Sequence, residues 1–167
     1  RMSSTSSLAR FAARLRGVNA SPNPLSRAAF QELALELFEL QFEHNAPYRR
    51  FCKGRGVGPG GAGGWAEIPA VPAAAFKDWE LSCLPAGQRT TVFHSSCTTT
   101  QRPSRHFHNE ESLALYEASL LAWFNAHLPF AIGNWQLAIL TPPPAQVPHS
   151  SLVHMFETLR RALSFAD

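Results

Sequence analysis

The sequence predicts an α/β fold, in which a small and mostly parallel sheet is flanked by helices. Apolar side chains recur at helical spacing in three long segments, residues 26–44, 109–128 and 150–163. Two short apolar segments between them, residues 90–94 and 135–140, have the length and composition of strands. The resulting order of helix, strand, helix, strand and helix is the alternation that produces parallel sheets.

Each long helix is predicted to begin at a residue whose side chain accepts a hydrogen bond from the first turn. These residues are Ser26, Asn109 and either Ser150 or Ser151. Glu110 and Glu111 follow the second of them, where the helix macrodipole favours negative charge. Pro47 ends the first helix, and shorter helices are predicted over residues 48–53 and 73–78.

Residues 1–22 are predicted to form a basic, Ser-rich and flexible tail. The first acidic residue of the chain is Glu32, and such a composition is shared with organelle transit peptides. Leu8, Phe11 and Leu15 have the spacing of one helical face. A short basic terminus is nevertheless more commonly a poorly ordered tail, and this is the structure we expect.

Within the partial domain predicted over residues 23–167, the segment 54–64 is predicted to be a mobile connector. It contains seven of the ten glycines of the chain together with Pro59. Its Gly-x-Gly pattern is not typical of a dinucleotide-binding turn, because no predicted strand precedes it and no helix directly follows it.

Composition narrows the classes of function. The chain has 167 residues, 45% of them hydrophobic, which is enough for one buried core. A net charge of +3 falls short of the dense basic surface of a nucleic-acid-binding protein, so no nucleic-acid partner is expected. No apolar run approaches the roughly 18 residues of a membrane span. Three widely spaced cysteines, Cys52, Cys83 and Cys97, indicate reduced thiols and a cytoplasmic location.

The most informative segment for function follows the first predicted strand. Five hydroxyl-bearing residues occur within residues 95–100, and the cations Arg102 and Arg105 follow them. Hydroxyl and main-chain N–H groups in such a turn suit the anionic oxygens of a phosphate, and arginine adds positive charge. The segment lacks the Gly-Lys-Ser/Thr ending of the P-loop enzymes, and on composition alone a surface loop is the commoner interpretation. The candidate phosphate ligands are Ser95, Ser96, Thr98, Thr99, Thr100 and Arg105.

Residues 95–106 resemble the Ser-Ser-Gly-Thr-Thr-Gly motif of adenylate-forming enzymes, in the variant that continues to Pro-Ser-Arg-His. This variant is similar to that of the acyl-protein synthetase family, which includes the synthetase of the bacterial luminescence fatty-acid reductase complex. The similarity covers most of residues 25–160. It includes Phe38, Gln41, Asn45–Tyr48, Ile68–Pro72, Ala75–Lys77 and Ser150–Leu152.

The resemblance implies an ATP-dependent enzyme activity. In that family the loop is implied to hold the phosphates of ATP with Mg²⁺, while a carboxylic acid, such as a fatty acid, attacks the α-phosphorus to give an acyl-adenylate and pyrophosphate. The acyl group then passes to a thiol of an acyl-accepting protein. Family members are longer than this chain, so the resemblance implies an amino-terminal portion whose sheet belongs to a larger adenylate-forming domain.

The residues of the loop also allow other interpretations. Cys97 and Thr100 stand where the family motif has glycine, which favours an alternative function, a catalytically degenerate or truncated interaction module of the same fold. His106 and His108, with His94 or Cys97 nearby, are candidate metal ligands. Cys97 is also a candidate nucleophile that His94 or His106 would activate.

Overall fold

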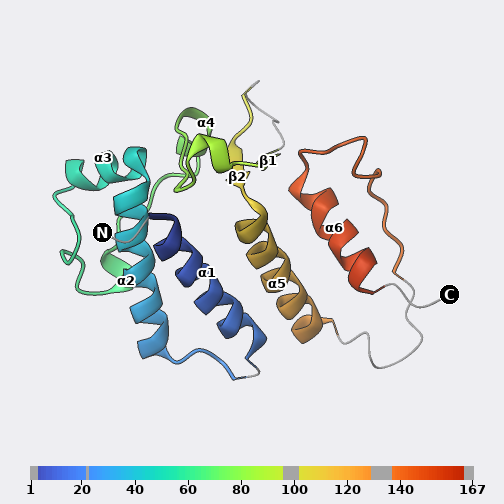
Figure 1. The fold of residues 1–167 in the computed structure, drawn as a ribbon, viewed down its shortest axis with the longest axis horizontal. Coiled ribbons are helices and arrows are strands. Elements are labelled where there is room, and N and C mark those ends of the chain that lie inside the picture. The colour runs from blue at the N-terminus through green and yellow to red at the C-terminus, as the bar shows by residue number, and fades with distance from the viewer. Residues whose placement is uncertain (1–3, 22, 96–101, 129–136, 164–167) are drawn as a thin grey trace.

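A computed structural model describes residues 4–21, 23–95, 102–128 and 137–163, and these residues are mostly helical (Figure 1). None of the helices in these ranges is both long and apolar enough to cross a membrane. The helices are α1 (Ser4–Ala20), α2 (Arg27–His44), α3 (Ala46–Gly54), α4 (Ala75–Asp78), α5 (Glu110–His127) and α6 (Ser151–Ala162), with 3₁₀ turns η1 (Trp65–Glu67) and η2 (Ala86–Gln88).

The only sheet in the described part of the chain is a two-stranded antiparallel hairpin. Its strands are β1 (Thr91–His94) and β2 (Arg105–His108), and Thr91 lies opposite His108 while His94 lies opposite Arg105. The position of β1 agrees with the strand predicted over residues 90–94, but the predicted mostly parallel sheet of an α/β fold is wrong. The segment that joins the two strands, residues 95–104, is shorter than the dozen or more residues that a parallel crossover requires.

A strand was predicted over residues 135–140, and the structure describes residues 137–140 of this segment. No strand is present in these four residues. Residues 137–140 have no regular secondary structure, and the side chain of Leu140 is 96% exposed. A strand needs a neighbour that completes its hydrogen bonds. The outer edge of β1 is already occupied, because the N–H of His94 donates to the carbonyl oxygen of His149.

The segment predicted as a flexible tail over residues 1–22 is helical over Ser4–Ala20, which corrects that expectation. Helix α1 lies between α2 and α5 and packs against both (Figure 1). Phe11 is only 5% exposed. Two arginines of the segment pair with acids of the neighbouring helices, Arg14 with Glu36 and Arg16 with Glu111. The helical spacing of the apolar residues was therefore the informative signal in this segment.

The predicted helix starts are confirmed. The side chains of Ser26, Asn109 and Ser150 each accept a hydrogen bond from the backbone N–H of the third residue that follows. Asn45 joins two helices: its N–H donates to Gln41 at the end of α2, and its Oδ1 accepts from Tyr48 at the start of α3. Because Asn45 is buried, this pair of bonds fixes the bend between α2 and α3.

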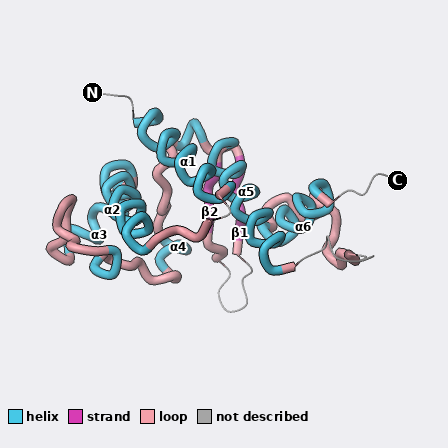
Figure 2. The backbone as a smooth tube through the Cα atoms, turned by 90° about the horizontal axis from the view of Figure 1, so that it is seen from below, coloured by secondary structure: helices cyan, strands magenta, loops and turns pink. Residues whose placement is uncertain are grey.

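A buried cluster holds α2 and α3 against the segment that follows them. It contains Phe38, Tyr48, Cys52 and Ala62. The segment predicted as a mobile connector, residues 54–64, thus contributes Ala62 to the core. The hydroxyl of Tyr48 donates to the carbonyl oxygen of Pro69 at 2.9 Å, which ties the chain beyond the connector to α3. Seen from below, the hairpin lies near the middle of the molecule, between α4 and α6 (Figure 2).

A Phe11→Ala substitution tests the packing of α1. Because this side chain is buried, we expect its truncation to lower the free energy of unfolding by about 3 kcal/mol. Arg10→Ala is the matched control, since Arg10 is exposed on the same helix. Chemical denaturation followed by circular dichroism measures both variants. Equal stability of the two would show that α1 does not pack on the rest of the chain.

Candidate functional site

The hairpin holds the two ends of the hydroxyl-rich loop next to each other. The N–H of Ser95 donates to the carbonyl oxygen of Ser104 at 3.2 Å, and the N–H of Ser104 donates to Oγ of Ser95 at 3.1 Å. Ser95 therefore lies at the base of the loop, with Arg105 one residue beyond its other end. The remaining predicted ligands, Ser96, Thr98, Thr99 and Thr100, lie outside the described residues.

Two carboxylates lie beside the cations at the base of the loop. Nη1 of Arg105 is 3.5 Å from Glu80, and Nη1 of Arg102 is 3.4 Å from Asp78. Glu80 also accepts a hydrogen bond from Nη1 of Arg89 at 2.8 Å. This hydrogen bond first, and then the positive charges of Arg89 and Arg105, hold the pKa of the Glu80 carboxyl below its usual value. The base of the loop is thus a mixed-charge cluster with arginine in excess.

The arginines of this cluster are also positioned by an aromatic ring. The guanidinium of Arg89 lies 4.4 Å from the ring centroid of Phe107, and that of Arg105 lies 5.6 Å from the same centroid. Contacts of this kind between a cation and an aromatic face are attractive. They hold the guanidinium groups of Arg89 and Arg105 beside Phe107 of β2.

His149 covers the outer edge of β1. Its carbonyl oxygen accepts from the N–H of His94 at 2.8 Å, and its Nδ1 lies 3.0 Å from the carbonyl oxygen of Val92. The rings of His94 and His149 are 4.8 Å apart between centroids. The pKa of His94 is lowered, first by desolvation and then by the charges of His149 and Arg105. The turn before α6 is therefore attached to the strand that leads into the loop.

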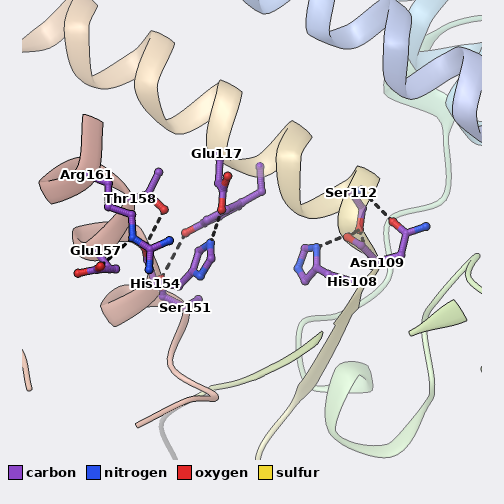
Figure 3. A network of polar contacts seen from close by, with 10 residues as sticks. His108, Asn109, Ser112, Glu117, Ser151, His154, Glu157, Thr158 and Arg161 are labelled. Carbon is purple, nitrogen blue, oxygen red and sulfur yellow. Dashed lines mark hydrogen bonds and ion pairs between the residues drawn. The ribbon is translucent and has the colours of Figure 1, made fainter. Parts of the chain in front are cut away.

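A second group of polar side chains joins α5 to α6 and to the end of β2 (Figure 3). Nε2 of His154 is 2.8 Å from Oε1 of Glu117, so the two residues bridge the helices. The buried ring of Phe93 contacts the rings of both His154 and His108, and Nδ1 of His108 lies 3.3 Å from Oγ of Ser112. Burial, followed by the charges of His106 and His154, lowers the pKa of His108. This group links the hairpin to both helices.

The structure bears differently on the two alternative interpretations of the loop, a metal site and a nucleophilic cysteine. Within the described ranges, no group of three or more histidine, cysteine or acidic side chains could hold a metal ion, and the ring of His106 instead stacks on Phe76. Cys97 lies outside the described residues, so its role as a nucleophile stays a prediction. Oγ of Ser104 lies 3.0 Å from Nε2 of His106, but Ser104 is buried, which places its hydroxyl out of reach of a substrate.

Sequence analysis did not identify the carboxylates or the histidine that surround the loop. Asp78 and Glu80 are separated from Arg102 and Arg105 by more than twenty positions, and nothing in their spacing indicates the contact. Nothing in the sequence around His149 indicates its contact with β1, because that contact arises only from the tertiary fold.

Comparison with known proteins does not assign this chain to a family. No protein-family model, no curated protein and no solved structure matches it. The resemblance to the acyl-protein synthetases thus remains a prediction from the sequence motifs alone.

The lowered pKa values of His94 and His108 predict a pH-dependent stability. The unfolded chain has the ordinary histidine pKa of about 6.5, so below that value it binds more protons than the folded chain. The contribution of these residues to stability is therefore present above about pH 6.5 and is lost as the pH falls through the lower folded-state pKa.

A His108→Gln variant measures this effect, with His127→Gln at the exposed end of α5 as the control. Urea denaturation at neutral and at mildly acidic pH gives the change in the free energy of unfolding. We expect the wild-type chain and the control to lose more stability on acidification than His108→Gln does. An identical loss in all three would contradict the lowered pKa of His108.

Proposed function

We propose that the loop of the β1–β2 hairpin binds the phosphates of ATP, in a protein that activates a carboxylic acid as its acyl-adenylate. The observation that carries this proposal is the pairing of Ser95 with Ser104 at the loop base. It closes the hydroxyl-rich segment into one loop and brings Arg102 and Arg105 back to the same place. Hydroxyls, main-chain N–H groups and guanidinium groups at one site are the donors that phosphate oxygens require.

The ion pair of Arg105 is compatible with phosphate binding. The side chains of Arg105 and Glu80 are 37% and 48% exposed, and an ion pair with this exposure contributes little to stability because water screens it. Glu80 also keeps Arg89 as a partner when Arg105 leaves. A triphosphate carries more charge than one carboxylate and accepts bidentate bonds, so it competes well for this guanidinium.

Mg²⁺ would arrive with the nucleotide in this proposal. The described residues offer no cluster of metal ligands of their own, and the nearby carboxylates of Asp78 and Glu80 both pair with arginine. The phosphate oxygens would therefore supply most of the ligands of the ion, which is common for Mg²⁺ bound to ATP. The ion supplies neutralisation of the phosphate charge, while the loop holds the phosphates in place.

The chemistry follows from the family that the loop resembles. An oxygen of the carboxylate attacks the α-phosphorus, the bond to the β-phosphate oxygen breaks, and pyrophosphate leaves with that electron pair. A thiol of an acceptor protein then attacks the acyl carbon, which forms a thioester and releases AMP. A fatty acid and an acyl-accepting protein are the partners in this proposal. The free state of the described cysteines, Cys52 and Cys83, supports a cytoplasmic location for it.

The second candidate function is a non-enzymatic interaction module that descends from the same enzymes. Cys97 and Thr100 favour it, since glycine is used where a backbone must approach a phosphate closely or adopt a positive φ. A Cβ at two such positions weakens nucleotide binding. The two functions therefore differ in whether the loop still holds ATP.

Pyrophosphate exchange tests the enzyme directly. With Mg²⁺ and a series of fatty acids, the full chain should incorporate labelled pyrophosphate into ATP. Thr99→Ala should reduce the exchange at least tenfold, whereas Thr90→Ala, at the start of the hairpin and outside the loop, should leave it near the wild-type level. Exchange that is no higher in the wild type than in Thr99→Ala would reject the activity.

Restoring the glycines tests the alternative. If the loop is a phosphate site weakened by its two side chains, the Cys97→Gly, Thr100→Gly double variant should bind ATP on the order of tenfold more tightly. Thr141→Gly is a control outside the loop. Isothermal titration calorimetry gives the dissociation constants. Unchanged affinity in the double variant, together with no pyrophosphate exchange, would favour the interaction module.

A further inference from the structure

A cavity of about 400 Å³ lies away from the hairpin loop, where α1, α2 and α5 meet the segment 81–88 and the last residues of β2. Figure 1 shows α1 between α2 and α5, and residues of all three helices line the cavity. Most of its wall is aliphatic or aromatic. The principal apolar side chains are Leu8, Phe11, Leu15, Leu37, Phe107 and Leu115.

The polar side chains in the wall are largely occupied by other contacts. Asn109 and Ser112 bond to each other's backbone as a capping box, and Asn45 caps α3. His108 contacts Ser112. Glu111 pairs with Arg16 at 3.5 Å. These groups therefore offer a ligand few free donors or acceptors.

The wall also lacks a cation that would bind an acid. None of the described residues that line the cavity is a lysine or an arginine. Burial lowers the pKa of His108, so its ring is neutral near neutral pH. Burial also raises the pKa of the Cys83 thiol to about 11, so this side chain is uncharged as well. A carboxylate or phosphate placed here would be desolvated without a counterion.

We propose that this cavity is a binding site for a small, uncharged, apolar molecule. Its volume falls within the range of roughly 300 to 1,000 Å³ that is typical of small-molecule sites. Phe107 and His108 line it at one end of β2, whereas Arg105 stands at the other end beside the loop. The proposed site is therefore distinct from the phosphate site, and it does not depend on the proposed activity.

The first experiment measures the binding of N-phenyl-1-naphthylamine, an uncharged dye whose fluorescence rises in apolar surroundings. We expect saturable binding of one dye per chain. Decanol should displace the dye at a concentration at least tenfold lower than decanoate, because the two have the same alkyl chain and only decanoate carries a charge. Equal displacement by the two would overturn the uncharged class of ligand.

A matched pair of variants locates the site. Ala12 lines the cavity, whereas Ala13 is exposed on the same helix. Ala12→Phe should fill the cavity and weaken dye binding at least tenfold, and Ala13→Phe should leave the binding unchanged. Circular dichroism checks that both variants fold. Equal dye affinity in the two folded variants would place the dye elsewhere and overturn the proposal.

A chemical reporter keeps the proposal testable if Ala12→Phe does not fold. In a Cys97→Ser background, the remaining thiols are Cys83 in the cavity wall and the fully buried Cys52. Saturating dye or decanol should slow alkylation of Cys83 by N-ethylmaleimide at least fivefold at mildly alkaline pH. An unchanged alkylation rate at saturation would show that the ligand does not occupy this cavity.

Discussion

Antiparallel pairing of Thr91–His94 with Arg105–His108 is the interaction that positions every candidate functional region of this chain. At one end of the ladder the pairing closes the hydroxyl-rich loop. At the other end it places Phe107 and His108 in the wall of the cavity. A shift of the register by one residue would turn the buried ring of Phe93 to the opposite face of the sheet. The hydroxyl-rich loop, the cavity wall at β2 and the packing of Phe93 would then all be displaced by the same change.

The two candidate sites have opposite chemistry although they share one strand. The base of the loop is exposed and contains arginine and carboxylate groups, whereas the cavity is apolar and lacks lysine and arginine among its described lining residues. Arg89 contacts both regions, because its guanidinium bonds Glu80 and lies over the ring of Phe107. The cation–aromatic contact therefore lies between the charged base of the loop and the apolar cavity.

Local signals in the sequence predicted where α2, α5 and α6 begin, and non-local contacts account for most of what it did not predict. Ser26, Asn109 and Ser150 mark the helix starts because an N-cap bonds only to residues of its own first turn. The sheet depends instead on which segments pair: β1 pairs with β2 across the loop, while residues 137–140 have no regular secondary structure. Helix α1 is held in place by packing against α2 and α5. The basic composition of its segment, from which we expected a flexible tail, gives no sign of this packing.

The same contrast between local signals and non-local contacts applies to the candidate site. Composition was sufficient to single out the segment from Ser95 to Arg105, and the hairpin places these two residues near each other. The partners of its arginines were not predictable, since Asp78 and Glu80 reach the loop base only through the tertiary fold. The cavity was not predictable either, because it is a property of how four separate segments pack.

The contact of His149 with β1 has a consequence for association between molecules. A free strand edge presents unpaired N–H and C=O groups that can pair with a second chain. On β1 the N–H of His94 and the carbonyl oxygen of Val92 are two such groups, and the carbonyl oxygen and the ring nitrogen Nδ1 of His149 occupy them. Intermolecular β-pairing along this side thus requires the turn before α6 to detach first, so the docking of α6 protects the hairpin against edge-to-edge aggregation.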